Sequence, residues 1–244
     1  SPETADTRDQ DSFATFIVPY AIMILFYTMI LVSASFMVNA VGKDKENKTI
    51  EVMLTSVSPM DLFLGKLLGY GAASLLQMIA WGGAVVLFIN LGGQSLDFLQ
   101  GFSLSSEKIL LGIPYFVLGF FLYGSLMAGV GAMSPNMREA NNSSFILTLP
   151  LIFLFLVINQ LIGQPNSFFS VFLSIFPLTS SVVMMTRLAI GAVPWWQIAL
   201  SLAVLIVTVY FIVRGVSNLF SSQTLLSGDK FKLKTFFRTI FVGR

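Results

Sequence analysis

The side chains that most often perform catalysis or bind metals are missing from this sequence. It contains no Cys and no His, which excludes thiolate chemistry, disulfides, Cys/His zinc sites and bis-His haem ligation. Gly65-Lys66 is followed by Leu67 and lacks the upstream glycine of the phosphate-binding sequence G-x-x-x-x-G-K-[ST]. We therefore expect no catalytic residue, cofactor or metal in this chain, and any ATP hydrolysis must occur in another subunit.

The remaining polar residues that could do chemistry are charged, and they concentrate in one stretch between two apolar segments, residues 43–66. In its first half, apolar residues recur at helical spacing: Ile50, Met53, Leu54 and Val57. This pattern predicts an amphipathic helix over residues 44–57. Ser58, Pro59 and Asp61 then supply a capping hydroxyl, a first-turn proline and a carboxylate that can reach back, so a new helix is predicted to start there. The alternative is an ordinary loop with a helix lying on lipid headgroups.

The overall composition belongs to a membrane protein with several crossings. Hydrophobic residues make up 55% of the chain and charged residues 11%, and the mean hydropathy is +0.83. So few charges could not cover a soluble domain of this size. The net charge is only +2, and nothing in its distribution indicates nucleic acid as a partner.

Five apolar segments are long enough to cross a bilayer as helices, at about 1.5 Å per residue. They cover residues 13–41, 67–91, 109–133, 145–162 and 198–213. Small residues in and beside the second segment are interpreted as helix-packing positions: Gly65, Gly69, Gly71, Ala72, Ala73, Gly82 and Gly83. Ser134-Pro135 repeats the capping device before the fourth segment. The prediction is an all-α polytopic membrane protein.

A sixth apolar stretch, residues 168–191, is predicted to be an outer re-entrant hairpin and not a crossing. It contains Pro177, Arg187 and many Ser and Thr residues, which we interpret as partners for the backbone of a broken helix and not as a catalytic site. Five crossings then place the acidic tail, residues 1–12, outside and the basic tail, residues 214–244, in the cytoplasm.

This orientation agrees with the distribution of positive charge, because of the 14 Lys and Arg residues only Arg8, Lys108 and Arg187 fall outside. The basic tail is predicted to form an amphipathic helix on the inner leaflet.

The charged stretch also resembles a known family. The order Lys43-x-Lys45-Glu46-Asn47-Lys48-Thr49-Ile50-Glu51-x-Met53-Leu54, then Ser58-Pro59 and Leu64-Gly65-Lys66, is similar to the signature of the permease subunits of ABC transporters of the type-2 exporter family. Weaker matches are the Ser134–Ala140 loop, Leu149-Pro150, the segment Arg187–Gly191 and the basic tail.

The resemblance implies a permease of an ATP-driven exporter in the cell membrane. Its partners would be an ABC ATP-binding subunit, which carries ATP and Mg²⁺, and a second permease copy or paralogue. Such permeases have six spans, the first preceding a large extracellular domain, so this chain is expected to be the C-terminal five-span portion of a longer subunit.

By resemblance, the helix over residues 44–57 is the coupling helix that docks on the ATP-binding subunit. The residues expected to contact that subunit are Glu46, Thr49, Ile50, Glu51, Met53, Leu54, Arg138 and Glu139. Met53 and Leu54 are also expected to hold the helix against the ends of the spans. Asn159 and Gln160 are the candidates for lining the pathway, with a helix-end cap or an interhelical hydrogen bond as the alternative role.

A non-transporting membrane scaffold that anchors a cytoplasmic partner is the rival hypothesis. A carrier or channel acting alone is disfavoured because the predicted spans contain no charged residue. An apolar pathway would suit lipid-like, drug-like or peptide cargo, whereas some relatives are associated with sodium export, and the sequence does not choose between these substrates.

Overall fold

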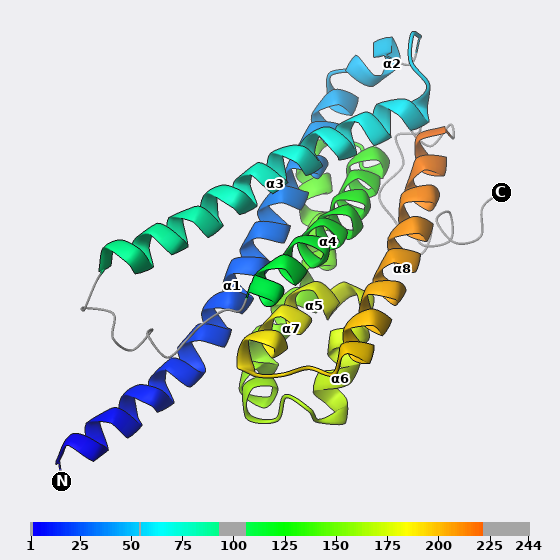
Figure 1. Ribbon diagram of the computed structural model, residues 1–244. Coiled ribbons are helices and arrows are strands. Elements are labelled where there is room, and N and C mark those ends of the chain that lie inside the picture. Colours follow the sequence, from blue (N-terminus) through cyan, green and yellow to red (C-terminus); the bar gives the residue numbers. More distant parts are fainter. Residues whose placement is uncertain (1, 54, 93–105, 222–244) are drawn as a thin grey trace.

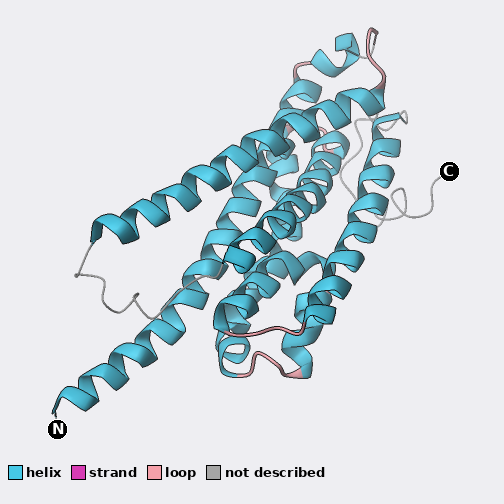
Figure 2. Ribbon diagram, in the orientation of Figure 1, coloured by secondary structure: helices cyan, strands magenta, loops and turns pink. Residues whose placement is uncertain are grey.

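The computed structural model describes residues 2–53, 55–92 and 106–221, and within these ranges all regular secondary structure is helical (Figures 1 and 2). The helices are α1 (Pro2–Glu46), α2 (Thr49–Met53), α3 (Pro59–Gly92), α4 (Ser106–Met133), α5 (Met137–Gly163), α6 (Phe168–Ile175), α7 (Pro177–Ile190) and α8 (Trp195–Ser221). The predicted all-α class is therefore confirmed. The amphipathic helix predicted for the C-terminal tail falls mostly on residues 222–244, which lie outside the described residues.

Five of these helices are long and apolar enough to cross a membrane, which confirms the predicted number of spans. The candidate spans are Ile17–Glu46, Pro59–Ala84, Glu107–Met133, Met137–Gly163 and Trp195–Phe220. Helix α1 continues beyond the predicted apolar segment, residues 13–41, at both ends. A helix satisfies its own backbone hydrogen bonds, so it can carry polar residues past the hydrocarbon layer without a break.

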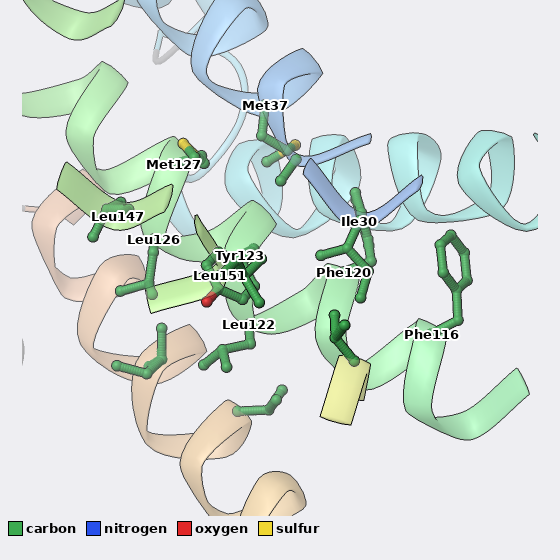
Figure 3. Packing of buried hydrophobic residues seen from close by; sticks show 14 of the residues in the cluster. Ile30, Met37, Phe116, Phe120, Leu122, Tyr123, Leu126, Met127, Leu147 and Leu151 are labelled. Carbon is green, nitrogen blue, oxygen red and sulfur yellow. The ribbon is translucent and has the colours of Figure 1, made fainter. Parts of the chain in front are cut away.

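Helices α1 and α4 form the centre of the bundle and make its most extensive contact. Figure 3 shows part of this core, including Ile30 and Met37 of α1 and Phe120 and Tyr123 of α4, all of them fully buried. A Cβ atom added at Gly131 of α4 would lie 3.0 Å from the Val38 carbonyl oxygen of α1. The two backbones can approach this closely because residue 131 has no side chain.

Of the glycines of α3 predicted to pack closely, only Gly71 meets a neighbouring helix in the described part of the chain. Gly65, Gly69, Gly82 and Gly83 have no atom of the described chain within 4 Å of an added Cβ, whereas Gly71 packs against Phe120. Helix α3 is the least buried of the five candidate spans, and Figure 1 shows its C-terminal half diverging from the bundle. Small residues permit close packing, but the tertiary arrangement decides which of them meet a neighbour.

Helices α6 and α7 form the broken hairpin predicted for residues 168–191. Phe176 ends α6 and precedes Pro177, the first residue of α7. Buried hydroxyl groups then bond the freed backbone carbonyls, as predicted: Thr179 Oγ1 donates to the Leu173 carbonyl at 2.6 Å and Ser170 Oγ donates to the Gln164 carbonyl at 2.8 Å. Figure 1 shows the hairpin toward one end of the bundle and α2 at the other, which we call the hairpin end and the α2 end.

Candidate functional site

The connection between α1 and α3 at the α2 end is a turn and a short helix, and not the single helix predicted over residues 44–57. Helix α1 continues to Glu46, and Lys48 then adopts a positive φ of 56°. A left-handed residue cannot continue a right-handed helix, so the chain turns before α2 begins at Thr49. The predicted restart at Ser58 is confirmed: the Asp61 N–H donates to Ser58 Oγ at 3.2 Å, and this hydroxyl donates to the Asp61 carboxylate.

Three interactions hold the connection and the adjoining end of α1 in place. Ile50 is only 3% exposed and belongs to the hydrophobic core. Asp44 at the end of α1 forms a salt bridge with Lys66 of α3. Lys45 Nζ donates to the Ala132 carbonyl at 2.7 Å, and this carbonyl lies in the last turn of α4. Ile50 thus attaches α2 to the core, while Asp44 and Lys45 join the adjoining end of α1 to α3 and α4.

The loop between α4 and α5 lies at the same end of the bundle. A Cβ added at Gly42 of α1 would collide with the Met137 sulfur in the first turn of α5. The capping residue of α5 is Asn136, whose side-chain oxygen accepts from the Glu139 N–H at 2.9 Å. The predicted start at Ser134-Pro135 is therefore wrong by two residues, because the Ser134 hydroxyl already donates to the Val130 carbonyl in α4. Arg138 is exposed and Glu139 is half-buried.

The outer face of this end carries four exposed apolar side chains, which we call the α2 surface. They are Val52, Met53, Val57 and Met60, with exposures of 70%, 39%, 45% and 47%. Met53 thus faces outward and not toward the spans as expected. Helix α2 has only five residues, and the turns after Met53 remove Val57 from the helical face that the periodicity assumed.

The other predicted contact residues differ in burial. Ile50, predicted as a contact of the ATP-binding subunit, is buried and anchors α2, whereas Met53, predicted as an anchor, is exposed. Glu46 is exposed and Thr49 is half-buried. Leu54 and the side chain of Glu51 lie outside the described residues.

The two candidates for lining the pathway have different surroundings. Asn159 of α5 lies in a groove of about 290 Å³ whose other walls are Ile17, Tyr20, Ala21, Ile24 and Ile162, so it is the one amide in a mostly apolar lining. Gln160 is exposed, and its Nε2 donates to Gln164 Oε1 at 3.0 Å. An edge-to-face contact between Tyr27 and Phe155, with centroids 4.9 Å apart, joins α1 to α5 near this groove.

Sequence reasoning missed one residue. Arg187 of α7 was counted as an outer surface charge, but it is 1% exposed. The sequence did contain a signal. Arg187 lies in an apolar segment that a helix-breaking proline, Pro177, divides, and an ionisable residue in such a segment is a candidate functional residue by default.

The chain is similar to known proteins over most of its length. The family described as "ABC-2 family transporter protein" matches residues 1–213. The chain is similar to the uncharacterized protein YhaP of Bacillus subtilis (strain 168), with 22% identity over 88% of this chain and 53% of the relative. It is also similar to the uncharacterized protein MJ1024 of Methanocaldococcus jannaschii, with 25% identity over 96% of this chain and 56% of the relative. The chain thus spans about half the length of these curated relatives. No solved structure matches it.

Proposed function

The chain belongs to the ABC-2 family of transporter proteins, and from this premise we propose that it is the permease of an ATP-driven exporter. In this proposal the spans form part of a pathway across the cell membrane, and separate ATP-binding subunits supply the energy. ATP and Mg²⁺ are bound by those subunits. Substrate moves outward when the subunits change the arrangement of the spans.

The observation that carries the proposal is the α2 surface and its attachment to the helical bundle. Apolar side chains that project beyond the ends of the spans are unfavourable in water, and a partner that covers them gains hydrophobic free energy. The surface is held by Ile50, by the Asp44–Lys66 salt bridge and by the bond from Lys45 to the end of α4. An exposed apolar surface that is anchored in this way suits a docking element that must transmit the movement of a partner to the spans.

The mechanism requires that the ATP-binding subunits dock differently in their two states. Only a difference in docking free energy between these states can shift the arrangement of the spans. Helix α2 passes the displacement to the adjoining end of α1, whose Asp44 and Lys45 bond α3 and α4. Arg138 and Glu139, at the start of α5, provide a second contact by which the same partner moves that helix.

A second permease copy or paralogue completes the pathway in this proposal. The groove between α1 and α5 is open on the surface of one chain and contains both Tyr20 and Asn159 among apolar side chains. Pairing of two chains across this groove would enclose it. Asn159 would then be a hydrogen-bonding group inside an otherwise apolar passage.

The orientation proposed is the one indicated by positive charge, with the α2 end in the cytoplasm and the N-terminus outside. Lys43, Lys45, Lys48 and Lys66 cluster at the α2 end. Cytoplasmic segments of membrane proteins carry an excess of such residues. Trp195 and Trp196 are exposed at the opposite end of α8, where aromatic side chains suit a membrane interface.

The test is purification of the tagged chain from its native membrane in mild detergent, with mass spectrometry of the proteins that stay bound. We expect a P-loop ATPase to copurify, and to be lost when Val52 and Met53 are both changed to Asp. Glu107→Gln is the control, because Glu107 is exposed at the other end of the bundle. Recovery of no ATPase with the wild-type chain would refute the proposal.

The rival scaffold function is tested on the same complex. A permease and its ATPase are coupled, so ATP turnover should respond to Asn159→Leu in the groove. A scaffold only anchors its partner, and turnover would then be the same for both chains.

A further inference from the structure

Arg187 of α7 joins three separate parts of the hairpin end. Its Nε donates to the Pro165 carbonyl at 2.7 Å and its Nη1 donates to Ser174 Oγ at 2.7 Å. Its Nη2 donates to Gln197 Oε1 at 2.9 Å and to Asn166 Oδ1 at 3.3 Å. The guanidinium therefore bonds the loop between α5 and α6, helix α6 and the first turn of α8 at the same time.

All four acceptors are uncharged. A guanidinium stays protonated in proteins, so the positive charge of Arg187 is buried with neutral partners alone in these hydrogen bonds. Removing a charge from water is costly, and neutral hydrogen bonds only partly offset this cost. The arrangement is favourable only while all three segments remain in place. If the hairpin moves away from α8, water can hydrate the guanidinium and stabilise the separated state.

Neighbouring hydrogen bonds extend this connection across the end of the bundle. Ser201 Oγ of α8 donates to the Ser174 carbonyl of α6 at 2.6 Å. Tyr115 of α4 donates its hydroxyl proton to the Ile198 carbonyl of α8 at 3.2 Å. Ser174, Ser201 and Tyr115 are all buried. The hairpin is thus attached to α8, and α8 to the central helix α4, through polar groups in a largely apolar interior.

We propose that Arg187 is a positioning residue that latches the α6–α7 hairpin to α8 and to the Pro165–Asn166 loop, and that release of this latch opens the hairpin end of the molecule. The latch follows from the hydrogen bonds and burial just described. Its use as the outer gate of a transport pathway rests on the function proposed above. The two statements are tested separately.

The latch is tested by cysteine protection, because the chain has no cysteine of its own. Ser201→Cys places a thiol at the interface between α6 and α8, at a position that is 0% exposed. Ser125→Cys is the matched control reporter, since Ser125 of α4 is also 0% exposed and its hydroxyl has no hydrogen-bond partner among the described residues. Each reporter is combined with Arg187→Met or with Gln197→Glu. The full chain in lipid nanodiscs is then labelled with a maleimide, with no partner subunit present.

The two changes at the latch should act in opposite directions. Arg187→Met removes the charged donors, and the loss of charge-assisted hydrogen bonds should accelerate labelling at position 201 by about tenfold or more. Gln197→Glu supplies a carboxylate to the same Nη2 group, and the stronger bond should slow labelling at position 201 by a similar factor. Labelling at position 125 should be unchanged in both.

Either of two results would overturn the latch. One is equal acceleration at positions 201 and 125 by Arg187→Met, which would mean a general loss of packing. The other is labelling of the Gln197→Glu chain as fast as, or faster than, the parent chain. Because Gln197→Glu keeps the arginine, it remains decisive if Arg187→Met does not fold.

The gating role is tested on the chain bound to its ATPase. A gate held too tightly should reduce ATP turnover in Gln197→Glu, while the amount of ATPase that copurifies stays the same. Slower labelling at position 201 with unchanged turnover would keep the latch and reject the gate. Failure of any ATPase to bind would reject the proposed function and leave the labelling result standing.

Discussion

Truncation of Ile50 should detach α2 from the bundle without altering the surface it presents. Ile50 is almost fully buried and is the residue of α2 that belongs to the hydrophobic core, whereas Val52 of the same helix is 70% exposed. The two positions therefore separate anchoring from docking within a five-residue helix. Ile50→Ala and Val52→Ala form a matched pair of truncations.

The magnitude follows from the buried hydrocarbon. Ile50→Ala removes roughly three methylene equivalents at about 0.8 kcal/mol each, or about 2.4 kcal/mol in total. This corresponds to a roughly 60-fold increase in the population in which α2 is detached. Large-to-small changes in cores also leave a cavity, so the effect can exceed this value. Val52→Ala removes an exposed side chain and should change the population by less than about twofold.

Hydrogen exchange of the backbone amides is the assay. In the chain alone, the amides of Val52 and Met53, which can bond inside α2, should exchange roughly 60-fold faster in Ile50→Ala than in the wild type, while amides at the centre of α4 should be unchanged. Binding of the ATP-binding subunit should weaken in both variants, in Ile50→Ala because the competent state is rarer and in Val52→Ala because a contact is lost. Unchanged exchange in Ile50→Ala would refute the claim that Ile50 anchors α2.

Three further predictions concern other parts of the molecule. Gly131→Val should prevent native packing of α1 on α4, because its side chain would meet the Val38 carbonyl. Gel filtration in detergent should show loss of the monodisperse peak. Gly83→Val should keep this peak, since no described residue lies within 4 Å of a Cβ added at Gly83. Exchanging the two charges of the partly exposed salt bridge, Asp44→Lys with Lys66→Asp, should restore most of the stability that either single reversal removes, about 0.2–1 kcal/mol for such a pair. Thermal unfolding of the wild type, the two single variants and the double variant checks this. Purely additive losses of stability would contradict a direct interaction. Asn159→Leu should leave copurification of the ATPase unchanged but alter its ATP turnover in the complex. Gln160→Leu should change the turnover less, because Gln160 bonds Gln164 on the surface. Equal effects of the two variants on turnover would argue against a role of the groove in the pathway.

Features that depend on neighbours along the chain could be predicted. The cap at Ser58 was correct because the hydroxyl, the proline and the Asp61 carboxylate lie within one turn. The break at Pro177 was predicted correctly: proline lacks the N–H that would bond the Leu173 carbonyl, and here the helix ends, whereas α1, α4 and α5 continue through Pro19, Pro114 and Pro150. The start of α5 was misplaced because Ser134 and Asn136 are both good capping residues. A hydrogen bond from Ser134 to α4 decides between them.

Periodicity was a weaker guide to the candidate docking surface. The apolar residues between positions 50 and 57 fit a single helix, but the left-handed conformation of Lys48 and the turns after Met53 divide the segment. Among the described apolar residues of this segment, Ile50 lies in the core, and Met53 and Val57 face outward. A helical pattern identifies an inner face only while the helix continues.

The sequence by itself determined the class of the protein, the number of spans and the broken hairpin, because these follow from the lengths of apolar segments and from residues that start or stop a helix. Only the tertiary structure decided which glycine lies at a helix crossing, which apolar residue of α2 is buried and what surrounds Arg187. These properties depend on atoms brought together from distant positions, such as Gly131 with Val38 or Arg187 with Pro165. The free energy of burying a glycine or a charge is set by those neighbours, and a linear sequence does not specify them.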